Sequence, residues 1–208
     1  MGRRRYLPPA TLVKNMEGGS DAPSSAEGIQ REEFALLERS RRGDRKAYGR
    51  IVELYQRRVF GLVCRVVGSE SAAEDITQEA FVRAYLAIDR FDTRRPFLPW
   101  IFRIALNLSR NWLKAAARRE TSCDPDILQS RLRPADECHG DRERLQRALS
   151  RLAPKYRIPL VLKHVEGLDY NEMKDVLKLP VSVLKMRVSR ARRMLAKLLE
   201  EEEGTGRS

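Results

Sequence analysis

Apolar residues recur at three- and four-residue intervals through most of this 208-residue chain. This spacing places them on one face of an α-helix, whereas a half-buried strand would alternate apolar and polar residues. Long alternating runs and Asn-Gly or Asp-Gly hairpin turns are missing from the sequence. The chain is therefore expected to be all-α. The clearest stripe consists of Tyr48, Ile51, Val52, Tyr55, Val59, Leu62, Val63 and Val66.

Capping residues and helix breakers divide this pattern into separate helices. Asp44 suits a helix N-terminus, and Asp169 with Glu172 forms a D-x-x-E capping box. Gly68 suits a helix C-terminus. Pro159 lies inside an expected helix and should kink or weaken it. The expected helices cover about 29–41, Asp44 to Gly68, Ser69 or Ser71 to Ile88, Pro96 to 119, 142–152, 154–166, 169–177 and 181–199.

The apolar stripe of each helix should face a core. In the first helix, Phe34 and Leu37 point inward, with Leu36 as a further candidate. In the helix that ends near Ile88, the stripe consists of Ala73, Ile76, Ala80, Ala84 and Ile88. The inward residues of the helix after Pro96 are Trp100, Ile104, Leu108 or Leu106, and Trp112, and those of the last helix are Leu184, Val188, Ala191, Leu195 and Leu198.

The charge of the chain is unevenly distributed. Its 41 Lys and Arg exceed its 29 Asp and Glu, giving a formal net charge of +12. Residues 30–119 have a net charge of +8 and residues 141–203 of +5, whereas residues 120–140 have −3. We expect two small basic helical domains joined by a flexible acidic linker. The excess of positive charge favours a polyanionic partner, most often nucleic acid.

The two ends of the chain are expected to be disordered tails. Residues 1–29 are rich in Gly, Ser, Pro and Ala and have no helical period, and residues 201–208 follow the last stripe. Met16 is a second candidate start besides Met1. The domain limits that follow are 30–119 and 141–200, with the linker at 120–140.

Several functional classes lack the residues that they need. No run approaches ~18 apolar residues, so a spanning helix is not expected. Cys64, Cys123 and Cys138 are too widely spaced for a zinc site or a disulfide framework, which favours a reducing cytoplasm. Cys64 is expected to pack as a small apolar residue, and His164 to pack or hydrogen-bond. No nucleophile, paired-carboxylate or phosphate-loop motif supports an enzyme, a metal or a cofactor.

The C-terminal segment suggests a helix-turn-helix. A short capped helix precedes the turn at 178–180, and a longer basic helix follows it. In that arrangement the second helix enters the major groove of duplex DNA. An alternative is that its cations form a solvated face or bind an acidic protein.

Aromatic and arginine residues alternate between Phe91 and Trp112. Unstacked bases lie on aromatic rings and guanidinium groups, so this stretch is suited to single-stranded DNA. We expect Phe102 and Trp112 to be core residues. For the loop from Phe91 to Phe97, core packing and base contact are evenly balanced.

The helix that ends near Ile88 presents an acidic face. Because carboxylates repel phosphate, this face is either a solvated surface or a protein-docking surface. Its polar residues are Glu74, Asp75, Gln78, Glu79 and Arg83.

Three stretches resemble the extracytoplasmic-function group of bacterial sigma factors. Residues 75–85 (DITQEAFVRAY) are similar to the D-x-x-Q-E-x-F-x-R-A-[WY] signature of that family. Residues 100–107 (WIFRIALN) are similar to W-[IL]-x-R-I-A-x-N. Residues 166–172 (EGLDYNE) with 185–192 (KMRVSRAR) are similar to its region 4 segment. The order and spacing of these motifs make the resemblance specific.

The resemblance implies a four-helix region 2 domain and a helix-turn-helix region 4 domain. It implies an alternative sigma factor that binds the β′ coiled coil and the β flap of core RNA polymerase, recognises −10 and −35 promoter elements, and is held by an anti-sigma factor. The linker would let the domains span both elements. The implied core-polymerase contacts are Asp75, Gln78, Glu79 and Arg83.

The resemblance also implies two sets of DNA contacts. The −10 contacts are Arg94, Phe97, Trp100, Asn107, Arg110 and Lys114, with one base flipped into a pocket. The −35 contacts are Ser182, Lys185, Met186, Ser189 and Arg190 near bases, and Arg187 or Arg193 near phosphate.

The helix-turn-helix departs from the family pattern. Met173-Lys174 replaces Ile-Ala, so the small residue expected where the two helices cross is lost. Lys178 stands where the turn usually has Gly, and residues 182–184 replace the usual Gly-Thr-Val. These changes affect the geometry of the turn and the −35 preference. The alternative function is a free-standing helix-turn-helix regulator, which would have no use for the Gln78–Glu79 face.

Overall fold

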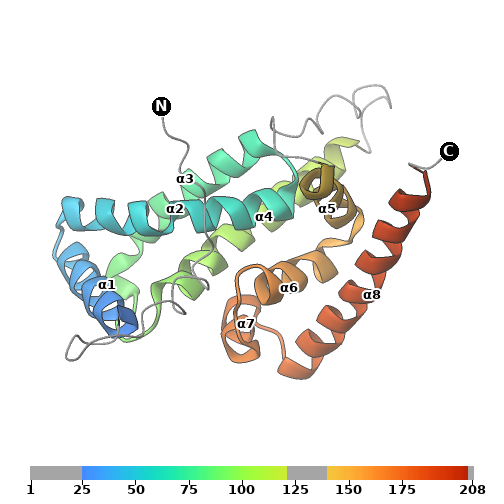
Figure 1. Cartoon of the computed structure of the whole chain (residues 1–208). Helices are drawn as coiled ribbons and strands as arrows, with labels where there is room; N and C mark the ends of the chain where they lie inside the picture. The colour runs from blue at the N-terminus through green and yellow to red at the C-terminus, as the bar shows by residue number, and fades with distance from the viewer. Residues whose placement is uncertain (1–24, 121–139, 206–208) are drawn as a thin grey trace, which may run out of the picture.

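The computed structural model describes residues 25–120 and 140–205, and their regular structure is entirely helical. The expectation of an all-α fold is confirmed for these residues. The first half consists of α1 (Ser25–Arg41), α2 (Arg45–Val67), α3 (Glu70–Leu86), the short 3₁₀ helix η2 (Ile88–Arg90) and α4 (Phe97–Glu120) (Figure 1). The second half consists of α5 (Gly140–Arg151), α6 (Pro154–His164), α7 (Tyr170–Leu177) and α8 (Val181–Thr205).

Helix boundaries follow the local signals in the sequence. The Asp44 side chain accepts hydrogen bonds from the N–H groups of Lys46 and Ala47, which caps α2. Gly68 closes α2 in the left-handed region at φ +76°, a conformation that costs glycine little. Ser69, rather than Ser71, caps α3.

The core of the first half lies between α2, α3 and α4. Ile51 and Leu62 of α2 and Ala80 of α3 have no exposed surface. The predicted stripe of α3 is buried, although α3 ends at Leu86 and η2 carries Ile88 into the core.

Two predicted faces differ from the structure. Phe34 is 48% exposed, whereas Leu36 and Leu37 are buried, because α1 turns the latter pair toward α2. In α4 the fully buried apolar residues are Phe97, Ile101, Phe102, Ala105 and Leu106. Trp100, Ile104, Leu108 and Trp112 are only partly buried, because α4 packs on α2 and α3 along one side and on α7 along another.

The second half buries its apolar stripes where α6, α7 and α8 meet. Leu184, Val188 and Ala191 of α8 are buried as predicted, and Leu195 and Leu198 are partly buried. α6 ends at His164 rather than near Glu166, and His164 is exposed instead of packed.

α8 is longer than the sequence predicts. The helix continues to Thr205, so the disordered tail expected at 201–208 is wrong for residues 201–205. Contacts with α5 explain this extension. Arg144 donates from Nη2 to Leu199 O (2.8 Å), and Arg151 pairs with Glu201 (3.2 Å). α1 begins at Ser25, so the expected N-terminal tail is also shorter than 1–29. Residues 1–24 of that tail and residues 121–139 of the linker lie outside the described ranges.

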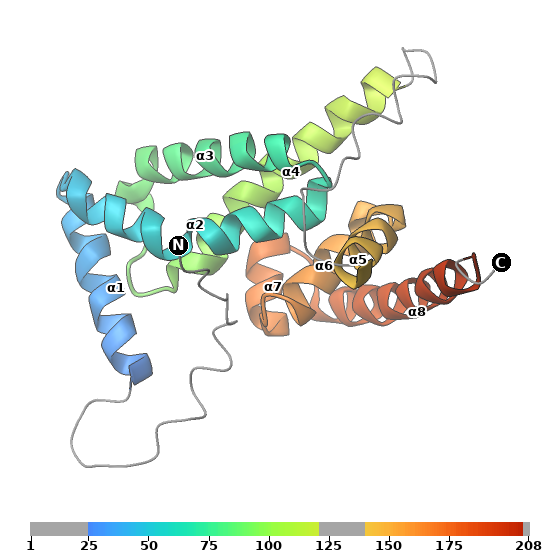
Figure 2. The ribbon, with the colours of Figure 1, turned by 45° about the horizontal axis from the view of Figure 1, so that its top comes forward.

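The two halves pack against each other along α2 (Figure 2). Arg157 of α6 is only 6% exposed and donates from Nη1 to Val66 O, near the C-terminal end of α2 (2.8 Å). Gln146 of α5 donates from Nε2 to Cys64 O (3.2 Å). One hydrophobic cluster contains buried side chains from both halves. This packing was not predicted from the sequence.

An ion pair completes this interface. Arg58 of α2 donates from Nη2 to Glu166 O (3.1 Å), and its Nε lies 3.4 Å from Glu166 Oε2. The Glu166 side chain is only 6% exposed. Burial raises the pKa of the Glu166 carboxyl, and the positive charges of Arg58 and Arg65 oppose this rise.

No helix within residues 25–120 or 140–205 is both long and apolar enough to cross a membrane. Within the same ranges, no three His, Cys, Asp or Glu side chains are grouped so that they could hold a metal ion.

Candidate nucleic-acid and protein interfaces

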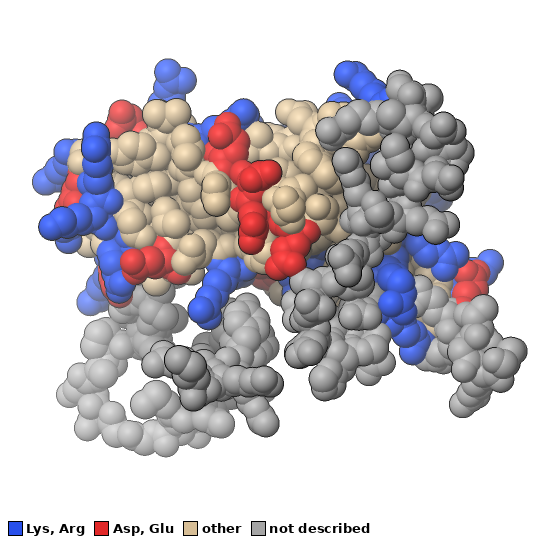
Figure 3. All heavy atoms as spheres, turned by 90° about the horizontal axis from the view of Figure 1, so that it is seen from above, with Lys and Arg blue, Asp and Glu red and all other residues tan. Residues whose placement is uncertain are grey.

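The polar face of α3 is open to solvent. Asp75, Gln78, Glu79 and Arg83 are all exposed, as their spacing predicts. Glu79 Oε1 accepts a hydrogen bond from Arg83 Nε (2.7 Å), an i,i+4 pair that fixes both side chains. Viewed from above Figure 1, acidic side chains form a band across a largely uncharged surface (Figure 3).

Two apolar residues beside this face were missed by the sequence analysis. Val82 is 53% exposed and Leu86 is 76% exposed. They follow Gln78 at four-residue steps and so extend the same side of α3. An acidic face bordered by exposed apolar residues is typical of a protein-docking surface rather than of a phosphate-binding one.

The loop between η2 and α4 is held by α1. Thr93 donates from Oγ1 to Glu38 Oε1 (2.7 Å), and the Phe97 N–H donates to Glu33 Oε1 (2.8 Å). The Thr93 hydrogen bond is the main reason that the pKa of Glu38 is lowered. Asp92 accepts from the Arg94 N–H (3.1 Å), which shapes the turn. Neither glutamate was singled out in the sequence, because nothing local marks a contact between distant segments.

Most aromatic side chains of this region pack on one another. Phe97 lies 5.8 Å from Phe91 and 5.5 Å from Trp100, measured between ring centroids. Phe91 and Phe97 are buried, and Trp100 is partly buried. The sequence left core packing and base contact evenly balanced for the loop from Phe91 to Phe97, and the structure shows core packing for both phenylalanines. Phe97 has no exposed surface for direct base contact in this structure.

A polar pocket of about 570 Å³ lies beside this loop. α1 contributes Phe34, Glu38 and Arg41 to its lining, and the other residues come from η2 and the loop. Arg94 belongs to the pocket and is exposed. The predicted −10 contact at Arg94 thus lies at a recess that is large enough for a nucleobase.

The remaining predicted −10 residues lie farther along α4. Asn107 and Lys114 are exposed, and Arg110 is half-buried. Arg110 Nη1 donates to Asn107 Oδ1 (3.1 Å). Burial lowers the pKa of Arg110, and the charge of Arg187 in α8 lowers it further. Arg110 of α4 and Arg187 of α8 therefore lie near enough for their charges to interact, so the two predicted DNA surfaces are close together in the packed chain.

α7 and α8 form the predicted helix-turn-helix. Both hydrogen bonds of the capping box are present at Asp169 and Glu172. Lys178 adopts the left-handed conformation at φ +56°, as expected for a residue at the usual glycine position. Met173 is fully buried and Lys174 is exposed, so no small residue is required at the position of Lys174. The expectation that the crossing of α7 and α8 needs a small residue at this position is therefore wrong.

The predicted −35 residues lie on the outer side of α8. Lys185 Nζ lies 5.8 Å from the ring centroid of Tyr170, the first residue of α7. This cation–π contact attracts the Lys185 ammonium toward the start of α7. Hydrogen bonding from Arg190 lowers the pKa of the Tyr156 hydroxyl. Tyr156 was not predicted from the sequence as a neighbour of α8. Ser182, Lys185, Met186, Ser189, Arg190 and Arg193 are exposed, and Arg187 is half-buried.

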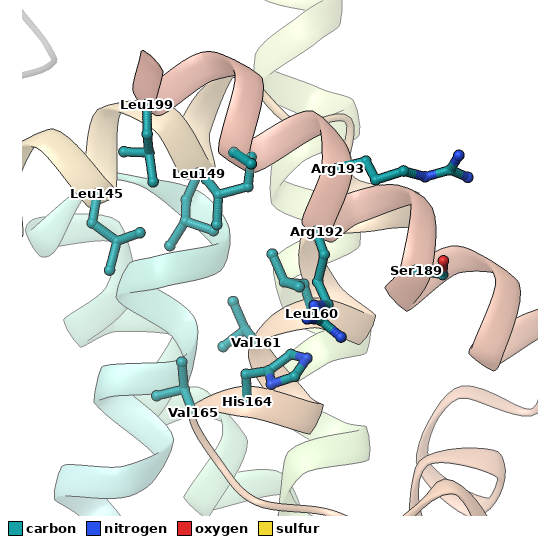
Figure 4. Close-up of a pocket in the computed structure, with 12 residues that line it drawn as sticks. Leu145, Leu149, Leu160, Val161, His164, Val165, Ser189, Arg192, Arg193 and Leu199 are labelled. Atoms are coloured by element: carbon teal, nitrogen blue, oxygen red, sulfur yellow. The ribbon is translucent and has the colours of Figure 1, made fainter. Parts of the chain in front are cut away.

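An apolar groove of about 610 Å³ is lined by residues of α5, α6 and α8 (Figure 4). Leu145 and Leu149 point into it from α5, and Leu199 from α8. Val165 on its floor is 47% exposed. Arg192 and Arg193 stand along one edge. This apolar surface is suited to a protein partner.

Comparisons with known proteins agree with these features. Residues 51–119 match the family model for Sigma-70 region 2, and residues 142–195 match that for Sigma-70, region 4. The RNA polymerase sigma-H factor of Pseudomonas aeruginosa is 33% identical over 82% of this chain and 95% of that protein. The ECF RNA polymerase sigma-E factor of Escherichia coli is 33% identical over 76% of this chain and 88% of that protein.

Among solved structures, CnrH in complex with the cytosolic domain of CnrY is similar, with a TM-score of 0.62 and 29% identity. The match covers 82% of this chain and 98% of CnrH. RpoE of Bartonella quintana has a similar fold, with a TM-score of 0.64 over 74% of this chain and 98% of RpoE. The protein belongs to the sigma-70 family of RNA polymerase sigma factors, in the extracytoplasmic-function group.

Proposed function

We propose that the protein is an alternative sigma factor that binds core RNA polymerase and directs promoter-specific initiation from −10 and −35 elements. One observation is central to this proposal. An exposed acidic face on α3 occurs in the same chain as two basic DNA-binding candidates, α4 with its loop and α8. A protein that bound only DNA would have no use for that acidic face. Sigma factors are not enzymes, and we infer a cytoplasmic location, where polymerase and promoters are found.

Region 2 has two separate partners in this proposal. Asp75, Gln78, Glu79 and Arg83 contact the β′ coiled coil, with Val82 and Leu86 beside them. Arg94, Trp100, Asn107, Arg110 and Lys114 contact the melted −10 strand, and the pocket next to Arg94 receives its flipped base. Phe97 supports this site indirectly by packing between Phe91 and Trp100.

Region 4 also has two separate surfaces in this proposal. The exposed side of α8 enters the major groove of the −35 element, with Ser182, Lys185, Met186, Ser189 and Arg190 at bases and Arg187 or Arg193 at phosphate. The apolar groove between α5, α6 and α8 receives the β flap. Because RpoE of Bartonella quintana was solved in complex with the anti-sigma factor NepR, we infer that a regulatory anti-sigma factor also binds this chain.

Core binding tests the α3 assignment. The double variant Gln78→Ala with Glu79→Ala should bind core polymerase at least tenfold more weakly, because it removes two polar contacts and the Arg83 ion pair. Glu53→Ala removes an exposed carboxylate from α2 and serves as the control. Affinity is measured by titrating labelled protein with core polymerase. Equal affinities for the wild type and the double variant would favour a free-standing helix-turn-helix regulator.

A further inference from the structure

Phe34 occupies an unexpected position in α1. Its side chain is 48% exposed, although the neighbouring Leu36 and Leu37 are buried. An exposed phenylalanine forgoes the stabilisation that burial would give it. Phe34 also lines the polar pocket beside the η2–α4 loop, so its exposed side chain borders this recess.

α1 and the loop form this recess as one rigid unit. Glu33 and Glu38, on either side of Phe34 in the sequence, both accept hydrogen bonds from the loop, at 2.8 Å from the Phe97 N–H and 2.7 Å from Thr93 Oγ1. The loop is therefore fixed relative to the Phe34 ring before any ligand binds. Because the aromatic residues of the loop are buried, Phe34 is the most exposed aromatic ring among the lining residues.

The other lining groups suit a nucleotide. Arg41, Arg90 and Arg94 provide cations for phosphate or for stacking, and all three are exposed. Asp89 and Asp92 provide carboxylate oxygens, which accept hydrogen bonds from exocyclic amino groups. The recess thus combines an aromatic ring, cations and acceptors. It lies at the end of the first half that both ribbon views show far from α8, so region 4 leaves it open.

We propose that Phe34 is the aromatic platform on which an unstacked base of the melted promoter strand lies, with a preference for the amino-bearing bases adenine, cytosine and guanine over thymine. The proposal rests on the assignment of −10 binding to the η2–α4 loop. It adds α1 as the second wall of that site. Glu38 and Glu33 act as positioning residues, since they hold the loop at a fixed distance from the ring.

Short single strands test the platform directly. The probes are fluorescein-labelled decamers of dA, dC and dT, and a decamer of abasic sugar-phosphate, titrated with the full chain in its complex with core polymerase. Phe34→Ala should weaken binding of the dA and dC decamers about 5- to 20-fold, the lower part of the range for loss of one base stack. Binding of the abasic decamer should not change, because it has no base to stack.

Three further variants make the test decisive. Phe34→Trp should retain dA binding, because its larger ring also stacks. Leu54→Ala, which removes an exposed apolar side chain from α2 outside the pocket, should bind all probes as the wild type does. Arg94→Ala should weaken binding of both the dA and the abasic decamer. If Arg94→Ala weakens binding but Phe34→Ala does not, the platform is wrong and −10 binding by the loop stands.

A comparison of the decamers on the wild type tests the preference for amino-bearing bases. The wild type should bind the dA and dC decamers more tightly than the dT decamer. Equal loss of dA and abasic binding in Phe34→Ala would also overturn the platform, because the variant would then act on the backbone contact. If neither Arg94→Ala nor Phe34→Ala changes binding of any probe, the assignment of −10 binding to the loop fails as well.

Discussion

At the scale of single residues, exposure separates side chains that can reach a partner from those that support them. Gln78 and Glu79 are exposed and Phe97 is buried, although the family resemblance implies a partner contact for all three. The helical period predicts the buried stripe of α3 because that pattern is local. The same period does not predict that Phe34 is exposed and Phe97 is buried, because this difference in exposure arises from the contact of α1 with a loop about 60 residues away.

A pair of substitutions on α8 separates base contact from phosphate contact. Lys185→Ala should lower discrimination between −35 sequences by ~1–3 kcal/mol, because a base-edge contact is lost. Arg193→Ala should weaken all duplexes alike and reduce the salt slope by about one, as loss of a phosphate contact does. Both side chains are exposed, so the fold should not change. Binding isotherms of the holoenzyme on matched and mutated promoters, at several salt concentrations, measure both effects. Equal behaviour of the two variants would contradict the proposed orientation of α8.

At the scale of elements, caps and turns were the most predictable features. Asp44, Gly68 and the Asp169–Glu172 box each act on backbone groups within a few residues, so the sequence alone identifies them. For the cap of α3 the sequence leaves Ser69 and Ser71 as alternatives, and the structure selects Ser69. The ends of α1 and α8 were less predictable. α8 continues past the expected end, and Arg151 of α5 pairs there with Glu201, a contact between residues 50 positions apart.

The turn of the helix-turn-helix contains removable strain. Lys178 is a non-glycine residue at φ +56°, which costs about 1–2 kcal/mol relative to glycine. Lys178→Gly should therefore raise the free energy of unfolding by ~1 kcal/mol, or the melting temperature by ~2–4 °C for a chain of this size. Lys174→Gly, inside α7, should lower the free energy of unfolding by ~1 kcal/mol. Thermal unfolding followed by circular dichroism measures both, and a loss of stability in Lys178→Gly would show that the lysine side chain stabilises the turn.

At the scale of the whole molecule, the packing of the two halves was not predictable. The composition predicts two basic domains and an acidic linker, but the hydrogen bonds of Arg58, Gln146 and Arg157 join surfaces that no local pattern relates. The −10 and −35 elements lie roughly 25 base pairs apart, or ~85 Å at ~3.4 Å per pair. A compact chain of this length has a radius of gyration of only about 17 Å. The packed arrangement must therefore open when both elements are bound.

Arg58 should control this opening. Arg58→Ala removes the hydrogen bonds to Glu166, each worth about 1.5–3 kcal/mol when a charged group takes part, and leaves the Glu166 carboxylate buried. The open form should become more populated, with a larger radius of gyration in small-angle X-ray scattering. Arg57→Ala, on the exposed side of α2, is the matched control. An unchanged radius in Arg58→Ala would mean that the apolar contacts and the hydrogen bonds of Gln146 and Arg157 hold the halves together without the ion pair.

The same interface should respond to pH. Burial raises the pKa of the Glu166 carboxyl in the packed form, so that form binds the proton more tightly than the open form does. Lowering the pH toward this raised pKa should favour the packed form, and raising the pH should favour opening. Scattering between pH 5 and pH 8 should show the radius of gyration growing with pH. Glu166→Gln has no charge to bury and should lose much of this dependence; an equal dependence in the variant would assign it to another group.

Promoter-directed transcription by core polymerase is the test of the proposed sigma-factor activity. Core enzyme is incubated with fragmented DNA from the source organism, with and without the protein, and new transcript ends are mapped. Discrete starts should appear only with the protein and should share elements at −10 and −35. Gln78→Ala with Glu79→Ala should abolish these starts, whereas Glu53→Ala should leave them unchanged. An absence of new starts, together with undiminished binding of the protein to duplex DNA without polymerase, would contradict its role as a sigma factor.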